Sequence, residues 1–253
     1  MNTNEFDLEF DIRYDNASKG APGIDKHEKS VYLTTAQEEL VKAAYSGFNE
    51  SGKGFEGSER KRRQLSELVR DYKVSSELPQ NTTSKNPKEN LIETSQFFGL
   101  PTDLMYIVLE SVKLKSTDPC LNNKIVPVKP VTHDEFQVEI KNPFKKPNGR
   151  KAWRLDLYRY GANQKAELFS VAKIDQYQIR YVKKPRPIIL VDFEEDPDLE
   201  GLGLTVDGSN RKTECELNTE IHREILNRAV ELAVVDSRES NLSNRINTNK
   251  RIV

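Results

Sequence analysis

Three groups of side chains in this chain of 253 residues have residue types that could do chemistry. The first is a carboxylate followed by a Glu-x-Lys triple: Asp134, Glu139 and Lys141. Carboxylates beside a lysine can hold a divalent metal next to a scissile phosphate, which is nuclease chemistry. Such a triple has to alternate on a strand, whereas these residues fall in or after a segment predicted to be a short helix. A metal-dependent nuclease is therefore the weakest of the three functions that this sequence suggests; the other two are given below.

The second group consists of His27, His133 and His222, which lie far apart in the sequence. They could bind zinc only if folding brought them together. His133 falls in the first turn of one predicted helix, and His222 falls on the charged face of another. Solvated imidazoles are therefore the expectation.

The third group is the acidic run from Asp192 to Glu200. Its carboxylates could bind a divalent cation, but their spacing is not that of a known calcium loop. The run therefore predicts a solvated acidic turn. The chain also has no GxSxG, HExxH, P-loop or GxGxxG string. We expect no enzyme activity, no metal and no cofactor.

Basic residues gather in two stretches, residues 60–63 and residues 141–159. Clusters of this kind bind phosphates in a salt-sensitive way, so a non-enzymatic nucleic-acid-binding protein is the second hypothesis. The net charge of −1 gives it no bulk support. The alternative is that the clusters pair with the acidic run, either within the chain or across to a neighbouring copy.

The composition is polar for a globular protein of this length. Hydrophobic residues make up 36% and charged residues 31% of the chain, and the mean hydropathy is −0.72. Part of the chain is therefore expected to be solvated or to be ordered by partners. Cys120 and Cys215 give no disulfide framework and fit a reducing cytoplasm. No signal peptide or membrane-spanning stretch is apparent, so we expect no membrane association.

Residues 1–74 are predicted to form an N-terminal helical region. The first helix is capped at Thr3, and the second begins at a Thr34–Gln37 capping box and ends at Gly47. A third begins at Ser58, and its apolar residues have the spacing of a buried helix face: Leu65, Leu68, Val69 and Tyr72.

Residues 75–90 are predicted to be a polar surface or contact loop. Residues 91–216 are predicted to be a mainly antiparallel β region, with one short helix that starts at a Thr132–Glu135 capping box. Two segments, "DLMYIVLESVKLKS" and "KIVPVKPV", are predicted to be extended. Four strand candidates with short connections are predicted to form an antiparallel meander: "KAWRLDLYR", "AELFSVAKI", "QYQIRYVKK" and "PIILVDF".

The C-terminal part is predicted to be a helix over residues 217–236, capped by Asn218, followed by an extended tail over residues 237–253. The tail has four basic residues and one acid, which is too little apolar surface to fold alone. The fold class is therefore α+β: N-terminal helices, a central antiparallel meander, a long C-terminal helix and a tail. We expect one structural domain overall.

The stretch "RYVKKPRPIILVDFEED", residues 180–196, combines cations, prolines, an apolar block and acids. Pro185 and Pro187 cannot donate to a sheet ladder, so they belong at an edge or a break. We interpret the stretch as a strand ending near Val182, a stiff crossing, and a buried strand over Ile188–Val191. We interpret it as a structural element at a subunit boundary and not as a catalytic site.

Several blocks resemble virion structural proteins of crAss-like and related short-tailed phages. They are "APGIDKHEKSVYLTTAQEELV", "PVKPVTHDEFQVEIKNPFKKPNGRKAWRLDLY", "YVKKPRPIIL" and "ELNTEIHREILNRAVELA". The resemblance implies a ring protein of the head–tail connector, stacked below the portal around the DNA channel. It implies closed rings with the symmetry of the portal, a dodecamer, and it brings no catalytic residues.

The expected partners are further copies of the chain, the portal protein, neighbouring ring and tail proteins, and passing DNA without sequence specificity. The expected location is the virion, after assembly in the host cytoplasm. Ring interfaces join two different faces, and opposite charges suit that geometry. The candidate assembly contacts are Lys145, Lys146, Arg150, Lys183, Lys184, Arg186, Glu194, Glu195, Asp196, Arg245, Lys250 and Arg251.

Overall fold

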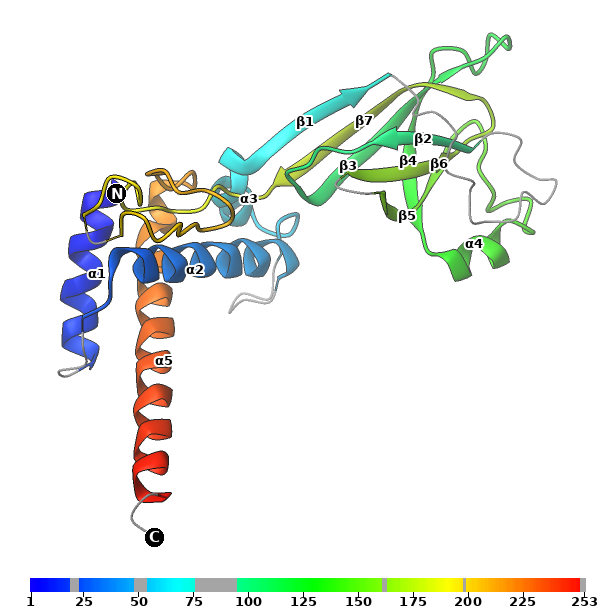
Figure 1. Ribbon diagram of the computed structural model, residues 1–253. Helices are drawn as coiled ribbons and strands as arrows, with labels where there is room; N and C mark the ends of the chain where they lie inside the picture. The colour runs from blue at the N-terminus through cyan, green and yellow to red at the C-terminus, as the bar shows by residue number, and fades with distance from the viewer. Residues whose placement is uncertain (19–22, 48–53, 76–94, 161–162, 198, 251–253) are drawn as a thin grey trace. The chain divides into compact units, whose positions relative to one another are not determined.

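The chain divides into two compact units (Figure 1). Unit 1 comprises Met1–Leu68 and Pro185–Val253, and unit 2 comprises Val69–Lys184. The computed structural model describes the following residues: 1–18, 23–47, 54–75, 95–160, 163–197 and 199–250. The predicted polar loop, residues 75–90, lies almost entirely outside them. The α+β class is confirmed.

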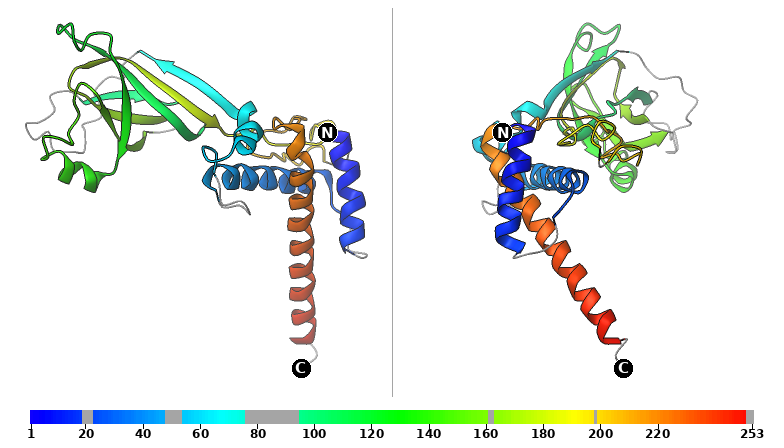
Figure 2. Two further views of the ribbon diagram at one scale, coloured as in Figure 1. Left: turned by 180° about the vertical axis from the view of Figure 1, so that it is seen from behind. Right: turned by 60° about the vertical axis from the view of Figure 1, so that its left-hand side comes forward.

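Unit 1 is built from helices and irregular segments. Helices α1 and α2 both contact α5, and Figures 1 and 2 show α1 running beside the first part of α5. Phe6, Phe10, Leu33 and Ile225 are fully buried among them. The helical elements are α1 (Thr3–Ser18), α2 (Lys26–Ser46), α3 (Glu59–Leu65), η1 (Ser66–Leu68), η2 (Thr219–Ile221) and α5 (His222–Lys250).

The first helix is capped one residue earlier than predicted. Asn2 and Glu5 form a reciprocal box: the Glu5 amide donates to Asn2 Oδ1 at 2.8 Å, and the Asn2 amide donates to Glu5 Oε2 at 2.9 Å. Thr3, the predicted cap, lies inside α1 and is buried. An asparagine can fill this role as well as a threonine, so the cap moved without changing the helix.

Helix α2 starts eight residues before the predicted Thr34, because Asp25 caps it by accepting from the Glu28 amide at 2.7 Å. Thr34 and Gln37 instead lie within the helix and bind a distant segment. Thr34 Oγ1 accepts from the Ile188 amide at 3.1 Å, and Gln37 Nε2 donates to the Arg186 carbonyl at 2.8 Å. The predicted end is confirmed, with Gly47 in the left-handed conformation at φ 82°.

The third predicted helix is shorter than its apolar pattern indicated. It ends at Leu65 and continues as one 3-10 turn, and Val69 and Tyr72 belong to strand β1 (Val69–Val74). There they pair with Val182 and Ile179 of β7 (Lys173–Lys183). Both residue types also favour strands, and the partner strand decides between the two structures.

Unit 2 contains one seven-stranded sheet with the order β1-β7-β3-β4-β5-β6-β2 (Figure 1). The sheet is mixed and not a simple meander, because β4 and β5 run parallel and β7 lies between β1 and β3. Helix α4 (His133–Glu139) connects the parallel pair, and its predicted Thr132–Glu135 capping box is confirmed. The remaining strands are β2 (Ser95–Gly99), β3 (Leu104–Lys115), β4 (Ile125–Val131), β5 (Ala152–Tyr160) and β6 (Asn163–Phe169).

The predicted strand over Ile188–Val191 is not a strand. Ile188, Ile189 and Leu190 are buried as expected, but among the described residues of this segment only Ile189 forms a bridge, to Thr213. Side chains of α2 replace the missing ladder: Thr34 accepts from the Ile188 amide, and Ser30 Oγ accepts from the Leu190 amide at 3.1 Å. Helix side chains thus satisfy the backbone of an irregular buried segment.

The C-terminal helix is longer than predicted. Asn218 caps its first turn by accepting from the Glu220 amide at 3.0 Å, as expected. The helix then passes Asp236 and continues to Lys250, so residues 237–250 are helical and not extended. No Gly or Pro occurs after Gly208, so nothing in the sequence interrupts the helix once it has started.

Candidate assembly surfaces

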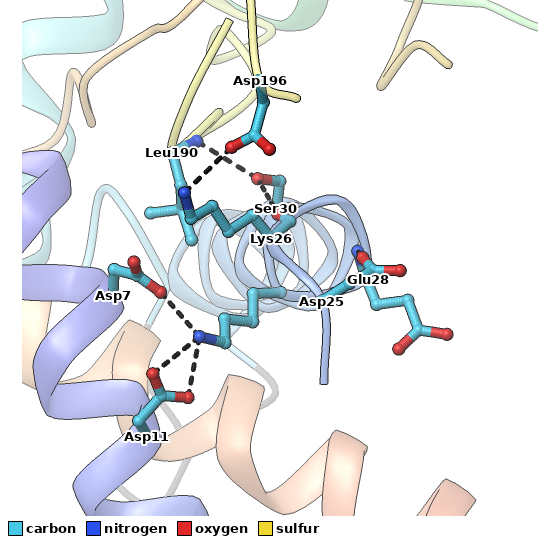
Figure 3. A network of polar contacts seen from close by, with 9 residues as sticks. Asp7, Asp11, Asp25, Lys26, Glu28, Ser30, Leu190 and Asp196 are labelled. Atoms are coloured by element: carbon cyan, nitrogen blue, oxygen red, sulfur yellow. Dashed lines mark hydrogen bonds and ion pairs between the residues drawn. The ribbon is translucent and has the colours of Figure 1, made fainter. Parts of the chain in front are cut away.

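The first turns of α2 hold both its neighbouring helix and the acidic run in place (Figure 3). Lys29 Nζ lies 2.7 Å from Asp7 Oδ1 and 2.7 Å from Asp11 Oδ1, both on α1. On the other side, Lys26 Nζ lies 2.9 Å from Asp196 Oδ2. The acidic run is therefore anchored within unit 1, and one of its predicted assembly contacts, Asp196, already has a partner there.

Lys29 is buried, with 5% of its surface exposed. Burial by itself acts to lower the pKa of Lys29, but the hydrogen bonds to Asp11 and Asp7 and the charges of these two residues more than offset it. The pKa is raised above its usual value. The lysine therefore stays charged and acts as a fixed tie between α1 and α2.

The predicted stiff crossing, the K-K-P-R-P segment at residues 183–187, is the connection from unit 2 to unit 1, since the unit boundary falls between Lys184 and Pro185. The Lys184 amide donates to the Asp103 carbonyl at 2.7 Å within unit 2. Within unit 1, Arg186 Nε lies 2.6 Å from Glu216 Oε1. The expected stiff crossing is thus held at both of its ends, and Lys183 ends strand β7.

The basic stretch 141–159 divides into a sheet part and a loop part. Arg154 belongs to β5, and its Nε lies 2.9 Å from the carboxylate of buried Glu110. Lys145 Nζ lies 3.1 Å from Glu139 Oε1, a carboxylate that also contacts Lys129 at 2.9 Å. These residues are therefore engaged inside unit 2.

The loop part, residues 141–151, which we call the basic loop, carries five cations and no acid. Lys141, Lys145 and Arg150 are exposed, and Lys146 and Lys151 are half-buried. At its tip Phe144 is 88% exposed, the most exposed of the large apolar side chains described. The sequence reasoning missed Phe144, although an Asn-Pro-Phe turn between lysines already argues against a core position.

Residues 192–197 and 199–207, which we call the acidic loop, form a surface of opposite charge on unit 1. Phe193, Leu199 and Val206 anchor it in a small buried cluster with Ile189. Glu194, Glu195 and Glu200 are exposed. Leu202 is 63% exposed between Gly201 and Gly203, whose φ angles are positive. The acidic loop therefore presents an apolar side chain among carboxylates.

Three candidate contacts lie at the C-terminal end of the chain. Arg245 and Lys250 fall within α5, and Arg251 lies outside the described residues. The backbone places the first two on a helix that extends beyond its last described buried residue, Val234.

Two of the candidate chemical groups, His222 and Glu139, are engaged in structural contacts. His222 is buried and not solvated as predicted: its Nδ1 lies 2.7 Å from the Met1 amino group, and its Nε2 lies 2.8 Å from the Leu217 carbonyl oxygen. Burial lowers the pKa of His222. Glu139 ends helix α4, so the Glu-x-Lys triple lies off the sheet, and the hydrogen bonds from Lys129 and Lys145 lower the pKa of Glu139.

Across the described parts of the chain, no three His, Cys, Asp or Glu side chains come together in a way that could hold a metal ion. In the same parts of the chain, no helix is both long and apolar enough to cross a membrane.

Comparison with known proteins identifies the family to which this chain belongs. Residues 1–245 match the family described as phage tail ring protein 3/4. Ring protein 3 of Bacteroides phage crAss001 is 40% identical over 214 residues, covering 84% of this chain and 85% of that protein. Ring protein 4/5 of the same phage is 35% identical over 239 residues, covering 92% of both. The chain therefore belongs to the phage tail ring protein 3/4 family, a family of phage structural proteins.

Proposed function

We propose that the chain is a ring subunit of the head–tail connector of a phage virion. In this proposal twelve copies close into a ring that surrounds the DNA channel, with the portal or another ring protein as its neighbour. The observation that carries it is the family match over residues 1–245, which includes both compact units. The whole architecture, and not a single module, thus corresponds to a ring protein.

The proposed role is structural and not enzymatic. Two side chains that could have done chemistry are engaged in holding the fold. Glu139 accepts from Lys129 and Lys145, and His222 is held between the Met1 amino group and the Leu217 carbonyl. A carboxylate that already binds two lysines is a poor candidate for a metal ligand, because both oxygens are used.

Electron microscopy of virions carrying a labelled copy of this chain tests the proposal. A gold-binding tag is added and virions are averaged with and without the label. We expect additional density in a ring around the tail axis, near the portal. Density on the capsid shell or at the distal end of the tail, or no incorporation at all, would contradict the connector role.

A nucleic-acid-binding protein is the second candidate, and the basic loop favours it, with five cations and no acid in eleven residues. The two candidates differ in affinity for free duplex. A ring subunit should bind a short duplex weakly, whereas a dedicated DNA-binding protein should bind tightly with a steep salt dependence. Fluorescence anisotropy over a salt series separates them.

The nuclease hypothesis has its own test. The protein is incubated with plasmid DNA in the presence of Mg²⁺ or Mn²⁺. We expect no nicking. Nicking that disappears in both Glu139→Ala and Lys141→Ala would contradict the structural role and restore the enzyme hypothesis.

A further inference from the structure

We propose that neighbouring copies join head to tail through the basic loop of one copy and the acidic loop of the next, with Phe144 packing against the exposed side chain of Leu202. This inference rests on the proposed ring function and names the contact that builds the ring. It depends on four observations: the exposure of Phe144, the rigidity of its loop, the opposite charge of the acidic loop, and the apolar residue within that loop.

An exposed phenylalanine forgoes the free energy that burial of its ring would supply, and a partner surface can provide that burial. Phe144 is 88% exposed, and Phe136, eight residues earlier, is 6% exposed in the core of the same unit. Large aromatic side chains are enriched at the centres of protein interfaces, where they supply much of the binding energy. The contrast between the two phenylalanines indicates that Phe144 serves a contact outside its own unit.

The basic loop is held rigidly enough to act as a docking element. The Phe144 amide donates to Asn142 Oδ1 at 3.0 Å, and the Lys145 and Lys146 amides donate to the Asn142 carbonyl at 3.1 Å. Lys145 is fixed by its ion pair with Glu139. A contact that is ordered before binding loses little conformational entropy on binding.

The acidic loop is the complementary surface on the chain. Residues 192–207 contain seven acids and no base, against five cations and no acid in residues 141–151. Leu202, 63% exposed, gives the acidic loop an apolar contact point, and the buried cluster of Ile189, Phe193, Leu199 and Val206 holds the loop in shape. Both surfaces thus combine an apolar contact point with charge of a single sign, and the signs are opposite.

A protein partner accounts for Phe144 better than duplex DNA does. Phosphates would satisfy the cations, but the bases of a duplex are stacked, and a phenyl ring could enter only by unstacking them. A second copy supplies both the carboxylates and the apolar contact. Because the two loops lie on different units, the contact is heterologous, which is the type of interface that generates rings.

Paired charge reversals test this contact. Variant A carries Lys146→Glu and Arg150→Glu, which lowers the net charge of its basic loop from +5 to +1. Variant B carries Glu195→Lys and Glu200→Lys, which reduces the acidity of its acidic loop and adds cations to it. Among the described residues, none of these four side chains forms an ion pair or hydrogen bond within its own unit, and Lys145 is left in place to hold Glu139. Self-association is measured by sedimentation velocity and native mass spectrometry of the full chain.

We expect the wild type to associate and each variant alone to associate at least about tenfold more weakly, because the changed positions repel and the net attraction between the two loops is reduced. The equimolar mixture should recover association. In one kind of A–B contact the changed positions of A meet the changed positions of B, whose charges are opposite, and in the other kind both loops are unchanged. An even-numbered ring can close with alternating A and B copies. Wild-type association that both variants retain, or a mixture no better than either variant alone, overturns this contact. Absence of wild-type association at any soluble concentration overturns it as well.

Truncation of the phenyl ring tests the apolar part separately. Phe144→Ala should weaken association at all salt concentrations without changing the melting temperature, because the side chain is exposed. Val171→Ala is the matched control, an apolar residue of the same unit that is 53% exposed. Equal effects of the two substitutions overturn the role of Phe144. If the charge test fails while labelled virions still show the ring, only this contact is rejected and the connector function stands.

Discussion

The Tyr177 hydroxyl donates a 2.7 Å hydrogen bond to Glu110 Oε2, and Arg154 Nε lies 2.9 Å from the same carboxylate. The three side chains come from β7, β3 and β5. Burial, followed by the Glu110 charge, raises the pKa of Tyr177 well above its usual value. Burial likewise raises the pKa of Glu110, against the opposing effects of Arg154 and Tyr177. This buried network ties three strands of the unit 2 sheet together.

Tyr177→Phe is predicted to destabilise unit 2 by about 1–3 kcal/mol, the usual cost of leaving a buried acceptor with one partner fewer. Glu110→Leu should cost more, about 3–5 kcal/mol, because it leaves the Arg154 charge buried without its carboxylate. The free energies of unfolding of both variants are measured by urea denaturation, with hydrogen exchange of the β3 and β7 amides as the probe. Lys113→Ala is the control: its pair with Asp175 is 3.8 Å long and more exposed, so about 0.5 kcal/mol is expected. Equal costs for all three would contradict the network.

Lys29→Met is predicted to loosen α1 from α2. The substitution keeps the apolar stem of the side chain but removes the cation shared by Asp7 and Asp11, so the two carboxylates are left close together without a partner charge. We expect a loss of about 1–3 kcal/mol in the free energy of unfolding. Lys42→Met removes a comparable i,i+4 pair with Glu38 on the exposed part of α2 and should cost about 0.5 kcal/mol or less.

His222 predicts that unit 1 is less stable in mild acid. The Leu217 carbonyl can only accept, so Nε2 donates to it, and Nδ1 accepts from the Met1 amino group. Burial lowers the pKa of His222, and the Met1 charge acts in the same direction, against the Leu217 hydrogen bond and Glu5. The folded state therefore disfavours the proton that the unfolded chain accepts at about pH 6.5. Stability is full above that pH and falls as the pH decreases from there towards the lower folded pKa.

Unfolding midpoints measured between pH 8 and pH 5 test this pH dependence. The wild type should lose stability through that window, and His222→Gln should lose less, because glutamine has no proton to accept. His133→Gln, on α4 of the other unit, is the matched control and should follow the wild type. A wild-type curve that His222→Gln leaves unchanged would mean that another group controls the response.

Local signals in the sequence predicted the helix ends best. The Thr132–Glu135 box, the Asn218 cap and the Gly47 stop each depend on hydrogen bonds within a few residues, so the pattern alone contains the information. The segment Ile188–Leu190 could not be predicted in this way. The amides of Ile188 and Leu190 donate to Thr34 and Ser30, more than 150 residues away. An apolar run in the sequence does not show whether a neighbouring strand or the side chains of a helix will accept these hydrogen bonds.

The candidate surfaces show the same difference between local features, which the sequence predicts, and contacts between distant residues, which it does not. The opposite charges of the two loops can be read from the sequence, and so can the cationic character of the segment around Phe144. The sequence did not reveal that Arg154 faces Glu110 inside the sheet or that Asp196 pairs with Lys26, because these pairs join residues 44 and 170 positions apart. The charges counted along residues 141–159 and along the acidic run are therefore more numerous than the charges available for contact with another molecule.

Ile225→Asp is predicted to unfold unit 1 or to destabilise it by about 3–5 kcal/mol. Ile225 is fully buried on α5, as its apolar stripe predicted, and an aspartate there would be a buried charge without a partner. Asn227→Asp places the same residue type two positions away on the exposed side, beside Arg13, and should have little effect. Thermal melts of the two variants give the comparison, and similar melting temperatures would rule out the burial of this stripe.

Truncation after Asp236 is predicted to leave unit 1 folded and to weaken docking in the virion. The last described buried residue of α5 is Val234, and the contact from the Tyr32 hydroxyl to Asp236 Oδ2, 3.0 Å, is kept. The removed residues, 237–253, carry four basic residues and one acid, and α5 continues through them to Lys250. A helix with that charge and so few apolar residues gains little by folding back on its own chain, so a neighbouring subunit or ring is its expected contact. Full-length chain with Arg245→Gln, Lys250→Gln and Arg251→Gln separates the effect of charge from that of length. Normal incorporation of the truncated chain into virions, measured by quantitative mass spectrometry, would show that this end of α5 has no part in assembly.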